Sequence, residues 1–191
     1  MTVKIGVLAL QGAVSEHMDA LTDSGAQAVA VKHIDELNDL DGLVLPGGES
    51  TTMRRLMDKT GLFEAIKSFA ASKAIFGTCA GLILMAQKIE GRQGPHLGLL
   101  DIDVKRNAFG RQVDSFEAQL KIEHVADDFD GVFIRAPYIK SVGPDVEILS
   151  TYEGHIVACR QGHFLTCAFH PELTGDTRFH RYFVHLVMEN K

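Results

Sequence analysis

The first half of the chain alternates short apolar runs with stretches in which apolar residues recur at helical spacing. The apolar runs, which predict buried strands, cover residues 5–10, 28–31, 43–45 and 74–76. Helical spacing is seen at Val14, Met18 and Leu21, with Gly25 closing that segment, and again over residues 53–57 and 62–71. This alternation predicts β-α-β units around a mainly parallel sheet.

Between residues 101 and 169 the apolar runs are shorter and are separated by Asp, Gly and Pro turns, which predicts an antiparallel extension. The expected strands cover residues 116–122, 132–134 and 146–149, with a hairpin over 156–168. A two-residue turn at Gln161-Gly162 would place Cys159 opposite Phe164 and Cys167 opposite Ile156. Helical spacing returns at the end of the chain, and its apolar stripe predicts core packing of Phe179, Tyr182, Phe183, Leu186 and Val187.

Composition favours one compact domain over residues 1–191, because 46% of the 191 residues are hydrophobic and can form a substantial core. We expect an α/β fold, a three-layer sandwich with a mainly parallel central sheet flanked by helices and an antiparallel extension. The formal charge of −6 and the pI near 5.8 argue against a nucleic-acid partner. No apolar stretch approaches the length that spans a bilayer, so we expect no membrane association.

Three cysteines, an odd number without metal-type spacing, fit a reducing compartment. They predict neither a disulfide framework nor a metal site. The chain leads directly into its first strand without a signal-peptide pattern. We therefore expect a cytoplasmic protein that uses no metal and no cofactor.

A Gly-x-Cys-x-Gly turn, Gly77-Thr78-Cys79-Ala80-Gly81, lies between the strand at 74–76 and a helix-like apolar run at 82–86. A nucleophile on such a strand-to-helix turn needs small residues two positions before and after it, because strand and helix approach closely there. Backbone N–H groups at the start of the helix favour a thiolate and can hold an oxyanion, with Ala80 as the first donor. The alternative is a buried structural cysteine.

A second motif, His170-Pro171-Glu172, favours the nucleophile interpretation. Proline makes this segment extended, so the side chains of His170 and Glu172 point the same way. Glu172 can then orient the imidazole as the third member of a catalytic triad. The alternative is a turn at the end of a strand. The other histidines have no comparable context and are interpreted as surface or packing residues: His17, His33, His96, His124, His155, His163, His180 and His185.

The segment at residues 46–52 follows the strand at 43–45, where the carboxyl ends of a parallel sheet line a binding crevice. Gly47 and Gly48 free backbone N–H groups there, which can supply a second oxyanion donor or hold the polar end of a substrate. The segment lacks the Gly-Lys-Ser/Thr ending of a nucleotide-binding loop. Its alternative interpretation is a turn with a helix cap at Ser50 or Thr51.

With these motifs the chain resembles class I glutamine amidotransferases, and within that class the glutaminase subunits of pyridoxal 5′-phosphate synthases. The matching signatures are residues 8–12, 45–52, 77–83, 106–112, 133–137 and 168–174. The resemblance implies a triad of Cys79, His170 and Glu172 that hydrolyses L-glutamine through a γ-glutamyl thioester. It further implies an oxyanion hole at Ala80, Gly47 and Gly48, and glutamine contacts at Gly47, Gly48, Glu49, Arg106, Ile134 and Arg135. The two arginines would suit the α-carboxylate and Glu49 the α-ammonium.

The resemblance also implies a partner, the barrel-shaped catalytic subunit of the synthase, in a hetero-oligomeric complex that receives the ammonia. Gln11 and Gly12 follow the first strand and are candidates for sensing this partner. Three alternatives stay open: a glutaminase of another amidotransferase, such as imidazole glycerol phosphate synthase; a thiol hydrolase or stress protein of the related α/β superfamily; and a non-enzymatic assembly subunit.

Overall fold

The computed structural model describes residues 1–107 and 115–191. The part of the expected signature 106–112 that follows Asn107 lies outside the described residues. In the described part of the chain, no helix is both long enough and apolar enough to cross a membrane.

One half of the central sheet is parallel, as the alternating pattern predicts. Its neighbouring strands, in order, are β2 (Gln27–Val31), β1 (Lys4–Leu8), β3 (Gly42–Leu45), β4 (Ala74–Thr78) and β12 (Phe164–Cys167). The strand β12 comes from the far end of the chain but pairs in parallel with β4, with Cys167 opposite Thr78. This pairing brings the segment that follows β12 next to the turn that follows β4.

The sheet continues beyond β12 through mostly antiparallel strands, which confirms the expected extension. These are β11 (His155–Gln161), β9 (Tyr138–Val142), β6 (Leu100–Lys105) and β5 (Ala86–Ile89), with β10 (Glu147–Tyr152) also paired to β11. In the described residues β7 (Ser115–Ile122) and β8 (Ala126–Ile134) form a separate two-stranded sheet, and β8 begins six residues before the predicted strand.

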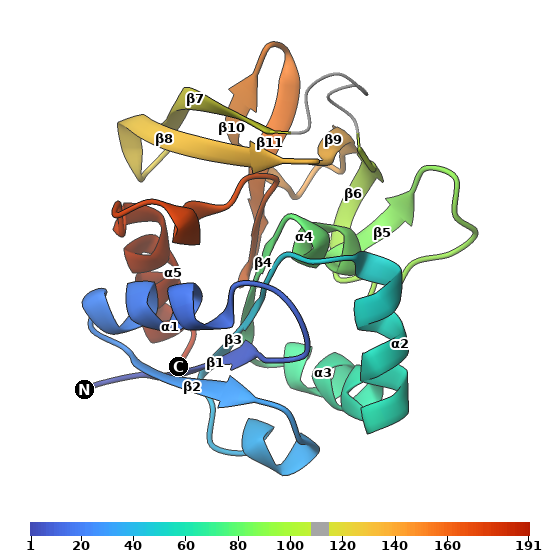
Figure 1. Cartoon of the computed structure of the whole chain (residues 1–191), viewed down its shortest axis with the longest axis vertical. Helices are drawn as coiled ribbons and strands as arrows, with labels where there is room; N and C mark the ends of the chain where they lie inside the picture. Colours follow the sequence, from blue (N-terminus) through green and yellow to red (C-terminus); the bar gives the residue numbers. More distant parts are fainter. Residues whose placement is uncertain (108–114) are drawn as a thin grey trace.

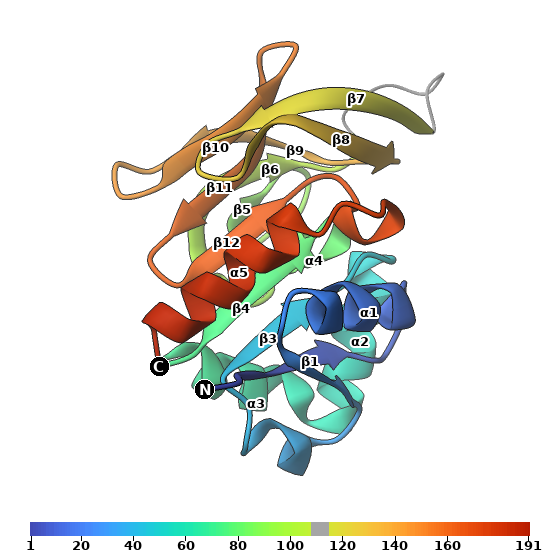
Figure 2. The same ribbon diagram turned by 90° about the vertical axis from the view of Figure 1, so that its left-hand side faces the viewer.

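Helices cover both faces of the parallel half, giving three layers (Figure 1). One side carries α1 (Val14–Asp23) and α5 (Arg178–Glu189), and the other carries α2 (Ser50–Thr60), α3 (Leu62–Ala70) and the short 3-10 helix η1 (Ile34–Leu37). The view in Figure 2 shows α5 running along β4 and β12. The short α4 (Ala80–Met85) follows β4, and a 3-10 turn, η2 (Pro171–Leu173), precedes α5.

An aromatic cluster joins α5 to the sheet. The ring of Phe76 on β4 lies 5.2 Å from that of Phe179 and 5.3 Å from that of Phe183, measured between centroids. Both phenylalanines of α5 are fully buried. Leu186 and Val187 are almost entirely buried, and Tyr182 is half-buried. The apolar stripe predicted for the last helix therefore packs into the core.

Two predictions are wrong. Ala86 begins β5 instead of ending the preceding helix. In the hairpin, Cys159 pairs with Thr166 and Cys167 with Ala158, because the turn consists of Gly162 and His163. Two-residue hairpin turns favour a residue with positive φ at their first position, and Gly162 has a φ of 59°.

Candidate active site

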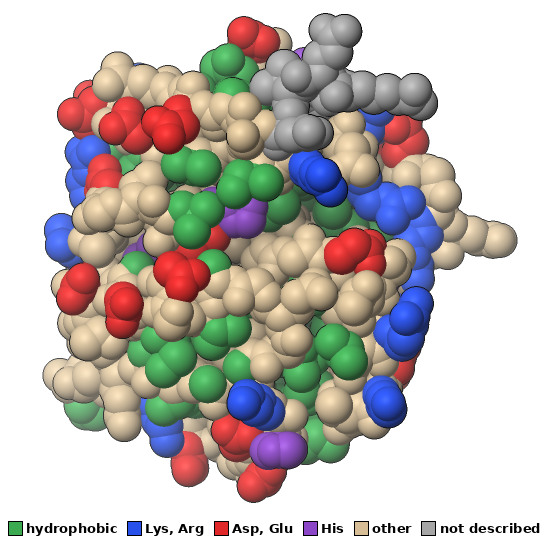
Figure 3. Space-filling model, in the orientation of Figure 1, with side chains coloured by type: hydrophobic (Ala, Val, Ile, Leu, Met, Phe, Trp, Pro, Cys, Tyr) green, Lys and Arg blue, Asp and Glu red, His purple; other side chains and the backbone are tan. Residues whose placement is uncertain are grey.

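A cavity of about 710 Å³ lies at the carboxyl edge of the parallel strands. Its walls come from the end of β8 and from the segments that follow β3, β4, β5, β6, β8 and β12. The expected site residues that line it are Gly48, Glu49, Cys79, Ala80, Arg106, Ile134, Arg135 and His170. The cavity is also lined by residues that the sequence analysis did not propose as site residues: Ser50, Ile83, Glu90, Asn107 and Pro137. Lys and Arg side chains gather beside α2 and the region of β5 on the face seen in Figure 3.

Cys79 occupies a strained turn between β4 and α4, with φ 53° and ψ −104°. Positive φ is uncommon for a residue with a side chain and marks a conformation that the surrounding structure must enforce. The two flanking glycines allow it: a Cβ at Gly77 would lie 2.6 Å from the backbone of Gly81, and a Cβ at Gly81 would collide with the carbonyl of Leu45. The predicted need for small residues on both sides of Cys79 is confirmed.

His170 and Glu172 form a short polar contact. His170 Nδ1 lies 2.6 Å from Glu172 Oε1, and the Glu172 side chain is completely buried. Because a carboxylate only accepts hydrogen bonds, Nδ1–H is the donor, and Nε2 remains available to interact with the Cys79 thiol. Burial lowers the pKa of His170, but the hydrogen bonds and charges of Cys79 and Glu172 outweigh burial and raise it to about 10. The site therefore favours an imidazolium beside Cys79 at neutral pH.

The 47–49 loop packs against the imidazole. A Cβ on Gly47 would lie 2.6 Å from His170 Cε1 and 3.5 Å from Cys79 Cβ, so glycine permits this close approach. Gly48 and Ala80 both line the cavity, whereas Gly47 lies behind His170 and is not part of the lining. The candidate oxyanion donors thus lie on two sides of Cys79.

Glu49 caps α2, so the cap is not at Ser50 or Thr51 as the alternative interpretation had it. The helix begins at Ser50, and the side chain of the preceding residue reaches the free amides of Thr51 and Thr52 at 3.1 Å and 2.8 Å. Both threonine hydroxyls also donate to this carboxylate. Hydrogen bonds from the Thr51 and Thr52 side chains lower the pKa of Glu49 to about 2.

The other residues expected to contact glutamine, Arg106, Ile134 and Arg135, line the cavity from the ends of β6 and β8. Arg106 follows β6, and Ile134 ends β8. Arg135 has a φ of 45° and lies one residue beyond β8. Cys79 Sγ lies 3.9 Å from the carbonyl oxygen of Ile134, so β8 closes over the nucleophile.

The predicted sensing residues touch the 47–49 loop and do not line the cavity. Gln11 Oε1 accepts a hydrogen bond from Glu49 N at 2.6 Å. Gly12 has a φ of 90°, and a Cβ on it would collide with the carbonyl oxygen of Gly47. The β1–α1 loop is therefore in direct contact with one half of the candidate oxyanion hole.

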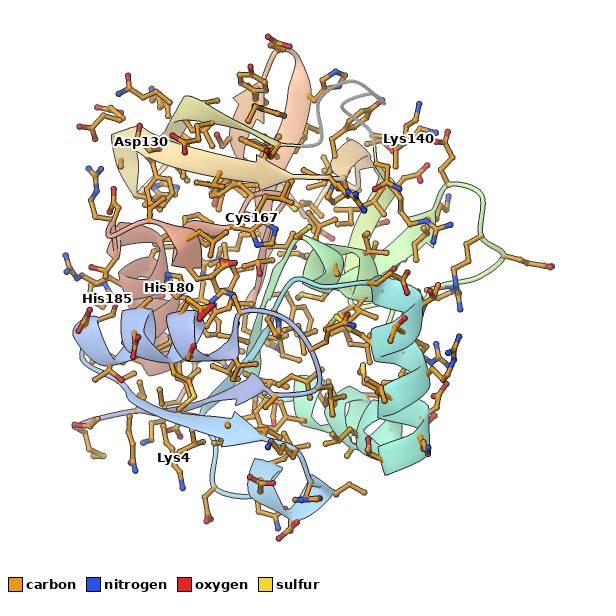
Figure 4. The ribbon with its side chains drawn as sticks, in the orientation of Figure 1. Lys4, Asp130, Lys140, Cys167, His180 and His185 are labelled. Atoms are coloured by element: carbon orange, nitrogen blue, oxygen red, sulfur yellow. The ribbon has the colours of Figure 1, made fainter. Side chains whose placement is uncertain are left out.

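The three cysteines differ sharply in environment. Cys79 faces the cavity, whereas Cys159 and Cys167 are completely buried; Cys167 is labelled in Figure 4. Burial raises the pKa of Cys159 to about 12 and that of Cys167 well above its ordinary value. All three thiols are free, and among the described residues no group of three or more His, Cys, Asp or Glu could hold a metal ion.

Sequence reasoning missed the contact of Glu172 with His17. This histidine on α1 is fully buried, and its Nε2 lies 3.4 Å from Glu172 Oε2. The burial agrees with the interpretation of His17 as a packing residue, but its position beside the carboxylate has no local signal in the sequence.

Comparisons with known proteins agree on one family. The sequence model of the SNO glutamine amidotransferase family matches residues 7–189. The chain is 81% identical, over the full length of both proteins, to the pyridoxal 5′-phosphate synthase subunit PdxT of Oenococcus oeni. It is 64% identical to the PdxT subunit of a Geobacillus species, with 99% of each chain covered. A crystal structure of a glutamine amidotransferase superposes with a TM-score of 0.91 at 46% identity, covering 96% of this chain and 98% of the other.

Proposed function

The chain belongs to the SNO glutamine amidotransferase family, and from this premise we propose that it is the glutaminase subunit of a pyridoxal 5′-phosphate synthase. It hydrolyses L-glutamine to L-glutamate and ammonia. The observation that carries the proposal is the strained Cys79 at a cavity next to His170, whose imidazole is held by Glu172 at 2.6 Å. A buried structural cysteine would need neither the strained backbone nor the imidazole.

The first half of the reaction forms a thioester. The Cys79 thiolate attacks the γ-amide carbon of glutamine, and the carbonyl oxygen becomes an oxyanion. The N–H of Ala80 and N–H groups of the Gly47-Gly48 loop stabilise that oxyanion. The His170 imidazolium gives its proton to the leaving nitrogen, so the C–N bond breaks and ammonia departs.

The second half releases glutamate. Neutral His170 takes a proton from a water molecule, whose oxygen attacks the thioester carbon. The C–S bond then breaks, which frees glutamate and restores the thiolate beside an imidazolium. Glu172 accepts from Nδ1–H throughout, so it keeps Nε2 directed at the reacting atoms.

The part of the cavity wall at the ends of β6 and β8 supports amino-acid recognition. Arg106 and Arg135 would bind the α-carboxylate, and Ile134 would pack on the side chain of glutamine. Glu49 would face the α-ammonium, and the hydrogen bonds from the amides and hydroxyls of Thr51 and Thr52 keep it ionised for that role.

The ammonia passes to a barrel-shaped synthase subunit with which this chain forms a hetero-oligomeric complex. Two features support this part of the proposal: the PdxT relatives are named as subunits, and Gln11 and Gly12 contact the 47–49 loop. Through these two residues, docking of the synthase subunit would affect the oxyanion hole. The whole chain, 1–191, would act as one glutaminase domain, and three free thiols suit the cytoplasm.

Glutamate release from glutamine, measured for this protein alone and mixed with a pyridoxal 5′-phosphate synthase subunit from the same source, tests the proposal. We expect strong stimulation on mixing and complete loss in Cys79→Ala. Ammonium salts should restore pyridoxal phosphate formation by the Cys79→Ala complex, because only the ammonia supply is missing. Glutaminase activity indifferent to the synthase subunit would instead favour another amidotransferase, and unchanged synthesis from glutamine in Cys79→Ala would favour a scaffold.

A further inference from the structure

The second oxygen of Glu172 poses a question that the mechanism leaves unanswered. Oε1 accepts from His170, but Oε2 is buried and has no hydrogen-bond partner among the described residues. A buried carboxylate oxygen without a donor is costly. His17 Nε2 approaches this oxygen to 3.4 Å, but the contact does not have the geometry of a hydrogen bond.

His17 belongs to a buried chain of polar groups. Its Nε2 lies 3.3 Å from the hydroxyl of Thr78, the residue before the nucleophile. Its Nδ1 lies 2.9 Å from Nε2 of His180 on α5, which Figure 4 labels on the side of α5 toward α1. Both imidazoles are completely buried, and His180 also packs edge-on against Phe76. Three elements, α1, β4 and α5, therefore meet behind the triad.

Electrostatics favours one arrangement of protons on these buried polar groups. Burial lowers the pKa of His180 to about 4 and that of His17 well below its ordinary value, the charges of His180 and His170 adding to the effect on His17. Both rings are therefore neutral, and each carries one N–H. A proton on His17 Nε2 faces both the Glu172 carboxylate and the Thr78 hydroxyl oxygen, which accepts, whereas a lone pair on Nε2 would repel the carboxylate. His17 Nδ1 must then accept from His180 Nε2–H, which leaves His180 Nδ1 as the unprotonated end, and that atom has no partner in the described residues.

Packing alone does not explain these two rings. Two apolar rings would fill the same space without burying polar atoms, and the histidines leave His180 Nδ1 unpaired. The pair places the Nε2–H group of His17 beside the carboxylate of Glu172. The second ring, His180, fixes the tautomer of His17. A neutral donor orients the carboxylate without neutralising the charge that His170 requires.

We propose that His17 is a positioning residue of the triad, which holds Glu172 from the side opposite His170, and that His180 fixes the tautomer of His17. The proposal rests on the glutaminase function proposed above. His17 touches no substrate. It acts through Glu172 on the orientation of the His170 imidazole, so it affects the chemical steps and not glutamine binding.

Steady-state kinetics of the complex with the synthase subunit tests this. In His17→Phe we expect kcat for glutamine hydrolysis to fall about 10- to 100-fold with KM within about twofold, because orientation of the base is lost while the cavity is intact. His17→Gln, whose amide N–H reaches the position of Nε2, should recover most of kcat. His17→Asn, which can still accept from His180 but is too short to reach Glu172, should not.

His163→Phe is the matched control. Its imidazole Nε2 contacts the carbonyl of Ala70, and it lies at the turn before β12, at the edge of the sheet opposite the cavity. This variant should keep kcat within twofold. Ammonium-dependent pyridoxal phosphate formation should be unchanged in every variant, which separates a damaged triad from a damaged complex.

Nitrogen-15 NMR of the histidine rings in the wild-type protein gives a second readout that needs no substitution. We expect both His17 and His180 to carry their proton on Nε2. A proton on Nδ1 of His17, an unchanged kcat in His17→Phe, or equal activity of His17→Gln and His17→Asn would overturn the proposal. Absence of glutamine hydrolysis by the wild-type complex would instead overturn the glutaminase function itself.

Discussion

Gly47 lies where any side chain would displace the imidazole of His170. The loop that carries it is held from outside by Gln11 and passes behind the triad, so its backbone has little freedom to retreat. The nucleophile is similarly confined, with its strained φ permitted by close packing of Gly77 against Gly81. At these positions the absence of a side chain is the functional property.

Gly47→Ala should therefore reduce kcat for glutamine hydrolysis by at least about 100-fold, since its Cβ would lie 2.6 Å from His170 Cε1. Unfolding temperature and ammonium-dependent synthesis should change much less than kcat. Gly175→Ala is the control, because a Cβ there meets no atom within 4 Å. Equal activity of the two variants would contradict the close approach described here.

Helix α2 depends on the carboxylate that precedes it. Glu49 accepts from two backbone amides and two hydroxyls of the first turn, so it satisfies free N–H groups at the start of the helix with a negative charge. The same residue faces the cavity. One side chain therefore fixes the start of α2 and presents a negative charge to the cavity.

Glu49→Ala should lower the free energy of unfolding by about 1 kcal/mol, the usual contribution of a helix cap, as measured by urea denaturation. The hydrogen bonds lower the folded-state pKa of Glu49 from 4.5 to about 2, so the unfolded state binds its proton first as pH falls. The stabilisation is therefore complete above pH 4.5 and is lost as pH falls through about 2. Glu64→Ala, in the first turn of α3 but without a capping hydrogen bond, should change stability by less than about 0.5 kcal/mol.

Most elements of the parallel half could be predicted from the sequence because each strand or helix carries its own periodicity. The hairpin register could not be derived from alternation alone: moving the turn from Gln161-Gly162 to Gly162-His163 shifts the pairing by two residues, and the decision rests on one positive φ. The cap at Glu49 could not be derived from the sequence, because Ser and Thr are more common caps and both follow Glu49 directly.

The two halves of the proposed triad come from distant parts of the chain and are brought together by the parallel pairing of β12 with β4. The motifs around Cys79 and His170 were recognisable in sequence because each has a local backbone requirement, a sharp turn in one case and an extended proline segment in the other. His17 and His180 have no such local backbone requirement. They lie 163 residues apart, and only the packing of α1 against α5 brings their rings together behind Glu172.

The segment from Gln11 to His17 contacts two parts of the site. Its first residue holds the 47–49 loop, and its last lies beside Glu172. In the complex, Gln11→Ala should reduce stimulation by the synthase subunit at least about fivefold, because docking would no longer be transmitted to that loop. The ratio of glutamate release with and without the synthase subunit measures this. Gln27→Ala, an exposed glutamine at the start of β2, should leave the ratio unchanged, and equal ratios in the two variants would contradict the coupling.

The different environments of the three thiols make this protein suited to active-site titration by covalent labelling. An alkylating reagent such as iodoacetamide reacts with thiolates, and burial keeps Cys159 and Cys167 protonated and out of contact with solvent. Cys79, in contrast, lines the cavity. A single adduct per folded chain, read by intact-protein mass spectrometry, would thus count competent catalytic centres in any preparation, and a fluorophore attached there would sit beside the loop that docking is proposed to move.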